Sequence, residues 1–227
     1  MRTIFAPAQV GTIAPTRILL LPAAYTGPED FVREGFVSAV RERAISLDLV
    51  FAELKPQHLM DRTVLRRVRH EIVLPARALG CRSLWLGGIS LGGFVALAYA
   101  ERYPDEIDGL CLFAPYLGNH IVTGEIERSN GVGGWQPGEL ASDDDERRIW
   151  RFIKTHRARS LSVHLGFGHD DRFADSHRLM AAALPAESID VVPGGHEWPA
   201  WRRLWANFLD ARFSGDGTVQ ERLKSSP

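Results

Sequence analysis

The segment around Ser90 has the residue types and spacing of a reactive serine. Gly88-Ile89-Ser90-Leu91-Gly92 fits the pattern G-x-S-x-G. An apolar segment ends at this motif and a segment rich in small and apolar residues follows it, which predicts a strand that turns directly into a helix. A serine hydroxyl is a weak nucleophile at neutral pH, so this interpretation requires a histidine base and a carboxylate that orients the base. The alternative interpretation is that Ser90 is only a small residue in a tight turn and has no catalytic role.

Two later loops contain candidates for the base and the acid. The segment 166–173, GFGHDDRF, follows one predicted strand and offers Asp170 and Asp171. The segment 193–198, PGGHEW, follows the last predicted strand and offers His196. Because the carboxyl ends of parallel strands meet at one edge of a sheet, these loops can approach Ser90. The sequence therefore predicts a nucleophile, an acid and a base in that chain order.

Apolar segments alternate with amphipathic ones along the chain, and this alternation predicts the fold. Strands are predicted from residue 16, over 46–54, 83–90 and 109–117, and from residues 160 and 188. Helices are predicted over 28–44, 60–80, 91–104, 173–184 and 198–212. Strands joined by helices of this length pair in parallel through right-handed crossovers. We expect a doubly wound, mostly parallel sheet in a three-layer α/β/α sandwich.

One long connection interrupts this alternation. Residues from about 118 to 159 show no strand signal, and an insertion of this length at the strand ends is more often a lid or binding loop than a plain connection. Its acidic run after Ser142 predicts a helix capped by that serine rather than a metal site. We expect a single domain over 1–213 that includes this lid, and a flexible polar tail over 214–227.

Composition excludes several classes of partner and cofactor. In 227 residues, 27 Lys and Arg balance 28 Asp and Glu, so there is no overall positive charge to bind nucleic acid. No apolar segment approaches the roughly 20 residues of a membrane span, and the N-terminus does not resemble a secretory signal, which favours a cytoplasmic protein. Cys81 and Cys111 are predicted to be buried thiols.

No metal or cofactor is indicated by the remaining motifs. The spacing of His164, His169 and His177 matches no standard zinc motif, and structural or solvent-exposed roles are the simpler interpretation. No G-x-G-x-x-G stands in the first strand-to-helix turn, so a dinucleotide is not expected.

The three motifs GISLGG, GHDDRF and GGHEW, in this order, resemble those of the α/β-hydrolase family of serine esterases, thioesterases and related acyl hydrolases. The resemblance extends from about residue 16 to residue 212. It implies the α/β-hydrolase fold, with Ser90 as nucleophile, His196 as general base and Asp171 as the acid. Asp171 is preferred because family loops of the form G-x-x-D-x-F place the acid at this position. Asp170 is the alternative acid.

The resemblance also implies an oxyanion hole built from two backbone amides. Leu91 N–H supplies one. The second comes from the loop after the first predicted strand, where Pro22 has no N–H, so Ala24 is expected to donate, with Tyr25 as the alternative.

The predicted function is hydrolysis of a small-molecule carboxylic ester or thioester through an acyl-enzyme intermediate, without a cofactor. An acyltransferase with the same catalytic residues, or a non-catalytic small-molecule-binding protein on this scaffold, is the alternative. Aromatic residues near the predicted loops could line a substrate pocket, although packing roles are equally open; they are Tyr25, Tyr116, Trp135, Phe167 and Trp198. The sequence predicts neither the acyl and leaving groups nor the oligomeric state.

Overall fold

A computed structural model describes residues 1–155 and 161–213 of the chain. Its sheet has seven strands in the order β1-β3-β2-β4-β5-β6-β7. The strands are β1 (Thr3–Ala6), β2 (Thr16–Leu21), β3 (Leu47–Ala52), β4 (Ser83–Ile89), β5 (Gly109–Phe113), β6 (Ser162–Gly168) and β7 (Ile189–Val192). All neighbouring pairs are parallel except β1 with β3. The predicted mostly parallel sheet is confirmed.

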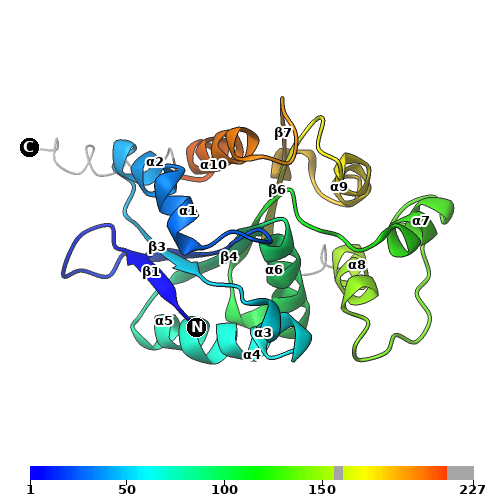
Figure 1. The fold of residues 1–227 in the computed structure, drawn as a ribbon, viewed down its shortest axis with the longest axis horizontal. Helices are drawn as coiled ribbons and strands as arrows, with labels where there is room; N and C mark the ends of the chain where they lie inside the picture. Colours follow the sequence, from blue (N-terminus) through cyan, green and yellow to red (C-terminus); the bar gives the residue numbers. More distant parts are fainter. Residues whose placement is uncertain (156–160, 214–227) are drawn as a thin grey trace, which may run out of the picture.

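Helices cover both faces of the sheet. They are α1 (Pro28–Arg33), α2 (Phe36–Glu42), α3 (Pro56–Met60), α4 (Val64–Val68), α5 (Leu74–Ala78), α6 (Leu91–Arg102), α7 (His120–Arg128), α8 (Asp145–Thr155), α9 (Ala174–Ala181) and α10 (Trp198–Phe213). Short π and 3-10 turns lie at Arg69–Val73, Pro104–Glu106 and Ala186–Ser188. Figure 1 shows α1, α2 and α10 on one side of the sheet and α3 to α6 on the other. The three-layer sandwich is therefore as predicted.

The central strands are buried along their length because both faces are covered. Every residue of β3 and β5 is buried, as expected for parallel strands between two helical layers. Rings of α10 and the sheet pack together, among them Trp85 with Phe208 at 5.5 Å and Phe113 with Trp205 at 6.1 Å between centroids. Cys81 and Cys111 are free and buried, which confirms the predicted thiols.

Strand β1 was not predicted from the sequence. It is four residues long and pairs antiparallel with β3 at the edge of the sheet, with Thr3 opposite Ala52. Its residues are exposed or only half-buried, and Phe5 is 50% exposed. An edge strand this short has too few alternating residues to produce a clear apolar pattern.

Two predicted helices are interrupted in the structure. The helix predicted over 28–44 divides into α1 and α2 at Gly35, whose φ of 83° is left-handed and cannot continue a helix. The helix predicted over 60–80 begins at Val64 and contains a π turn over Arg69–Val73. Pro75 follows this turn and lacks the N–H for a regular helical hydrogen bond, so the helix widens before it.

The insertion contains α7 and α8, and its strand-free prediction is confirmed for the described residues. The predicted cap at Ser142 is wrong. Helix α8 begins at Asp145, and Asp144 Oδ1 accepts a hydrogen bond from the backbone N–H of Arg147 at 3.1 Å. Asp144 is nearer the first free amides of the helix and therefore satisfies one of them. Residues 156–159 of the predicted lid and the predicted tail 214–227 lie outside the described residues.

Candidate active site

Ser90 lies in the turn between β4 and α6, at the carboxyl edge of the sheet. Its backbone has φ 52° and ψ −112°, a conformation that L-residues rarely adopt. The turn is held by backbone hydrogen bonds, since Ser90 N donates to Phe113 O at 3.0 Å and Ser90 O accepts from Tyr116 N at 2.9 Å. A strained serine that neighbouring backbone holds in place is typical of a nucleophile at such a turn.

Gly92 explains why the turn can pack so closely against β2. A Cβ atom at Gly92 would lie 2.1 Å from Leu21 O. Only glycine allows the first turn of α6 to approach the end of β2 at this distance. The spacing of the G-x-S-x-G motif is therefore a packing requirement of this strand-to-helix junction.

Asp171 and His196 form a hydrogen-bonded pair in the loops after β6 and β7. Asp171 Oδ2 lies 2.8 Å from His196 Nδ1, and Asp171 Oδ1 accepts from Phe173 N at 2.8 Å. The Asp171 side chain is fully buried and that of His196 is 10% exposed. Burial alone would raise the pKa of Asp171, but the hydrogen bonds from His196 and Phe173 outweigh it and lower the pKa below its ordinary value. The carboxylate therefore stays ionised beside the ring.

Asp170, the alternative acid, points away from this pair. Its side chain is 72% exposed and lies 2.9 Å from the Nδ1 atom of His169, which is also exposed. The structure brings Asp171, and not Asp170, into contact with His196.

Aromatic rings connect the turn at Ser90 with the His196 ring. Phe173 and Trp201 each contact the His196 ring edge-on, at 5.2 Å between centroids. Phe173 also contacts Tyr116 at 6.1 Å, and Tyr116 N donates to Ser90 O. Within residues 1–155 and 161–213, however, no hydrogen bond links Ser90 Oγ to His196 Nε2.

His177, on α9, is a buried neighbour of this site that sequence reasoning did not assign to it. Its Nε2 lies 2.9 Å from Pro115 O, and its Nδ1 is buried without a hydrogen-bond partner. Burial lowers its pKa to about 4, so the ring is neutral near neutral pH. The helical pattern over 173–184 carried no sign that this ring contacts the loop after β5.

Comparison with known proteins identifies the scaffold. A family model described as alpha/beta hydrolase fold matches residues 64–133. A ferulic acid esterase has a TM-score of 0.60 with this chain at 13% identity, over 92% of this chain and 96% of that one. The fluorophosphonate-binding serine hydrolase F of Staphylococcus aureus, solved with substrate bound, has a TM-score of 0.56 at 13% identity, over 88% and 84%. This chain has the α/β-hydrolase fold.

A curated relative also resembles this chain. The acetyl esterase of Caldicellulosiruptor saccharolyticus is 26% identical over 140 residues, which cover 56% of this chain and 53% of that protein. The chain thus matches about half the length of this relative.

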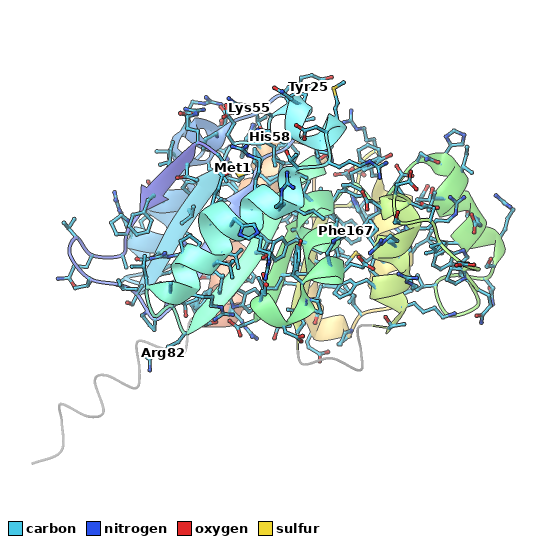
Figure 2. The ribbon with its side chains drawn as sticks, turned by 90° about the horizontal axis from the view of Figure 1, so that it is seen from below. Met1, Tyr25, Lys55, His58, Arg82 and Phe167 are labelled. Atoms are coloured by element: carbon cyan, nitrogen blue, oxygen red, sulfur yellow. The ribbon has the colours of Figure 1, made fainter. Side chains whose placement is uncertain are left out.

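The loop after β2 occupies the position in the α/β-hydrolase fold where a second oxyanion donor is expected. Ala24 and Tyr25 are exposed, and Tyr25 has a left-handed φ of 64°. Figure 2 shows Tyr25 at the same end of the molecule as Lys55 and His58, and Arg82, which precedes β4, at the opposite end. The loop therefore lies at the carboxyl edge of the sheet, where Ser90 also lies.

Two of the aromatic pocket candidates are buried in the protein interior. Trp135 is 1% exposed and donates its indole N–H to Glu125 at 2.9 Å, and Phe167 is 2% exposed. Trp198 packs edge-on against Trp201 at 5.1 Å and is half-buried. Tyr116 donates its hydroxyl to Glu146 at 2.8 Å, and burial raises its pKa to about 12. The structure places Tyr116 alone of these four in contact with the backbone of Ser90.

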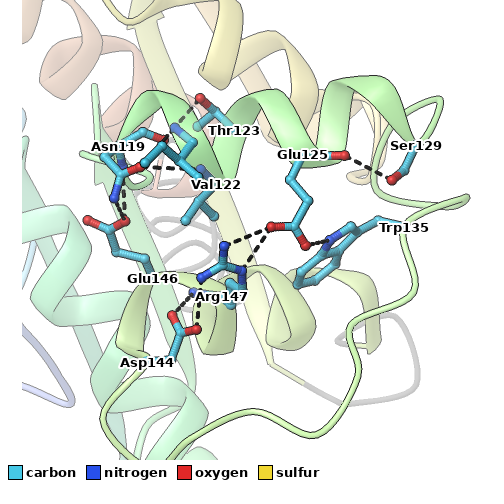
Figure 3. Close-up of polar contacts among 10 residues, drawn as sticks. Asn119, Val122, Thr123, Glu125, Ser129, Trp135, Asp144, Glu146 and Arg147 are labelled. Carbon is cyan, nitrogen blue, oxygen red and sulfur yellow. Dashed lines mark hydrogen bonds and ion pairs between the residues drawn. The ribbon is translucent and has the colours of Figure 1, made fainter.

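Hydrogen bonds hold α7 and α8 of the insertion together, as Figure 3 shows. Arg147 pairs with Glu125 at 2.8 Å and with Asp144 at 3.0 Å. Glu146 accepts from the Asn119 backbone at 3.0 Å in addition to its bond with Tyr116. The insertion is thereby anchored to the loop that follows β5 beside Ser90.

The described part of the chain has neither a cluster of metal-ligating side chains nor a membrane-spanning helix. There, no three His, Cys, Asp or Glu side chains gather as a candidate metal site. None of the helices in that part is both long and apolar enough to cross a membrane.

Proposed function

We propose that this protein is a serine hydrolase that cleaves a small-molecule carboxylic ester or thioester through an acyl-enzyme intermediate. Ser90 is the nucleophile, His196 the general base and Asp171 the carboxylate that orients the base. The observation that carries the proposal is the 2.8 Å contact between Asp171 and His196 at the sheet edge that also presents Ser90. The names of the relatives, an acetyl esterase and a ferulic acid esterase, support ester chemistry.

The Asp171–His196 pair is suited to generate a base. When Asp171 accepts a hydrogen bond from the Nδ1–H of His196, Nε2 presents a lone pair that can accept the proton of Ser90. The buried, ionised carboxylate then stabilises the imidazolium that forms. His196 afterwards returns the proton to the leaving alcohol or thiol, and water completes the cycle by attacking the acyl-enzyme.

The proposal requires that a hydrogen bond between Ser90 Oγ and His196 Nε2 forms when substrate binds. Catalytic hydrogen bonds are often long or misaligned before substrate is bound and shorten in the complex. Both residues belong to turns at the same sheet edge. We therefore propose that a small rotation of the two side chains forms this hydrogen bond.

Two backbone amides and the insertion after β5 also have roles in the proposed reaction. The amides of Leu91, at the first position of α6, and of Ala24 donate to the oxyanion of the tetrahedral intermediate. The described part of the insertion, residues 118–155, acts as a lid over the site, and the hydrogen bond between Glu146 and Tyr116 joins it to the loop beside Ser90.

Hydrolysis of 4-nitrophenyl esters from acetate to dodecanoate tests this function. The wild-type protein should release 4-nitrophenol with saturation kinetics for at least one chain length. The Ser90→Ala variant should be reduced to background, while Ser38→Ala, an exposed serine on α2, should retain full activity. Equal rates for the wild type and Ser90→Ala across the series would refute the proposal.

A further inference from the structure

A groove of about 630 Å³ runs along α6, away from the turn at Ser90. One wall is a stripe of α6 formed by Leu91, Phe94, Val95, Ala98 and Arg102. These positions lie on one helix face, because residues three, four, seven and eleven apart project in nearly the same direction. The opposite wall is the segment 59–66, which includes part of α3 and α4.

The inner end of the groove adjoins the proposed nucleophile. Leu91 directly follows Ser90, and Phe94 N donates to Ser90 O at 3.1 Å. The Phe94 ring contacts Tyr116 at 5.8 Å on its other side. A chain attached to a carbonyl at Ser90 could therefore enter the groove over Leu91 and Phe94.

The composition of the groove changes along its length. From Leu91 to Ala98 its helical wall is apolar, and at the far end it reaches Arg102, about 16 Å from Leu91 at 1.5 Å per helical residue. Arg62 and Arg66 lie on the opposite wall, so the groove is lined by three guanidinium groups. Its lining has two carboxylates, those of Asp61 and Asp145. The charged residues of the groove are therefore cationic overall.

The three arginines of the groove differ in their existing partners. Arg62 pairs with Asp143, outside the groove, at 3.7 Å. Arg66 and Arg102 are exposed, and in the described part of the chain neither comes within ion-pairing distance of a carboxylate, although Arg102 interacts with Asp145 at longer range. Asp61 accepts hydrogen bonds from its neighbour Thr63, at 2.7 Å from the hydroxyl. Two guanidinium groups thus remain available for an anionic ligand.

We propose that this groove binds the acyl chain of the substrate, and that the substrate is an ester or thioester whose extended apolar acyl chain ends in an anionic group. The proposal rests on the proposed function, because Ser90 must hold the carbonyl at the inner end. Leu91, Phe94, Val95 and Ala98 contact the chain, and Arg66 and Arg102 bind the terminal anion.

Turnover of matched esters tests the groove. The mono-4-nitrophenyl ester of suberate and 4-nitrophenyl octanoate have the same chain length and differ in a terminal carboxylate. We expect the wild type to favour the suberate ester in kcat/KM by about fivefold, the value for one or two exposed ion pairs. The Arg66→Gln, Arg102→Gln double variant should lower this preference to about one, whereas Arg203→Gln, an exposed arginine on α10, should retain it. A wild type without the preference, or a preference that survives the double substitution, overturns the proposal.

Substitution inside the groove supplies a second turnover test. Ala98→Phe should lower kcat/KM for both long esters by a larger factor than for the acetate ester, since acetate does not reach Ala98. Circular dichroism of the variant shows whether it is folded. Equal losses for acetate and the long esters would contradict the placement of the chain.

Binding to the inactive protein separates this proposal from the proposed function. Calorimetry with Ser90→Ala should show binding of monomethyl suberate that the added Arg66→Gln and Arg102→Gln substitutions abolish. If that binding is found but no ester is hydrolysed by the wild type, the groove stands and the proposed function fails. If the acetate ester is hydrolysed but Ser90→Ala does not bind monomethyl suberate, the groove is refuted and the proposed function stands.

Discussion

The carboxylate of Asp171 lies 2.8 Å from the imidazole of His196, although 25 positions separate them in the chain. The contact exists because β6 and β7 are neighbours and Gly168 pairs with Val192 at their ends. Beyond the strands, Asp170 N donates to Gly194 O at 3.0 Å. Backbone hydrogen bonding thus holds the two loops together before any substrate arrives, which positions the ring independently of the side-chain contact.

The two adjacent aspartates should differ sharply in their effect on activity. Asp171→Asn should lower kcat by about 10³- to 10⁴-fold, because the amide favours the wrong tautomer of His196. Asp170→Asn should change kcat by less than about threefold, since its side chain is 72% exposed and pairs with the exposed His169. Ester hydrolysis by both variants measures the difference, and a larger loss in Asp170→Asn would assign the acid to the other residue.

Removal of the amide at position 24 should impair catalysis without changing substrate affinity. We expect Ala24→Pro to lower kcat by about 10²-fold or more, because proline cannot donate to the oxyanion. Ala24→Gly retains the amide and serves as the control for changes in the loop backbone. If Ala24→Pro is folded and fully active, the second donor is another amide, with Tyr25 the next candidate.

Loss of the Glu146 carboxylate should loosen the insertion. Glu146→Ala removes the acceptor of three hydrogen bonds, one from Tyr116 and two from Asn119. Their loss should cost about 1 to 3 kcal/mol and lower Tm by about 2 to 12 °C. Activity should fall as well, because Tyr116 N also bonds to Ser90 O. Glu127→Ala, an exposed acid on α7, provides the matched control. An unchanged Tm in Glu146→Ala would show that this anchor contributes nothing to stability.

Acid should destabilise the protein through His177, which is buried, and His164, which is half-buried. Burial lowers the pKa of both His164 and His177 to about 4, whereas an unfolded histidine titrates near ~6.5. Between these values the unfolded chain binds protons that the folded chain does not, so stability falls as pH drops from about 6.5 to about 4. Urea unfolding across this range should show the loss, which should be smaller in His164→Leu and unchanged in His169→Gln, whose ring is exposed. The same slope in His164→Leu as in the wild type would show that this ring does not contribute.

Sequence patterns predicted the core strands because buried parallel strands are continuous apolar segments. β2 and β5 are examples, and all their residues but Thr16 are buried. The edge strand β1 has no such pattern, and the break at Gly35 depends on one backbone angle within an otherwise helical pattern. Local exceptions of this kind depend on tertiary packing, which a residue pattern does not report.

The candidate site was predictable in type but not in its surroundings. The motif around Ser90 and the loop positions of Asp171 and His196 were visible because each follows a strand. The burial of Trp135 beneath α7 and the approach of His177 to Pro115 were not visible, since both result from contacts between distant segments. The choice between Asp170 and Asp171 likewise depends on the direction in which each side chain points.

Covalent labelling of the intact protein tests the nucleophile most directly. Incubation with a fluorophosphonate, followed by digestion and mass spectrometry, should place a single adduct on the peptide that contains Ser90. His196→Gln should slow labelling strongly while circular dichroism shows an unchanged fold, because the hydroxyl loses its base. A folded wild-type protein that remains unlabelled, or that is labelled at another serine, would contradict the assignment of Ser90 as the nucleophile.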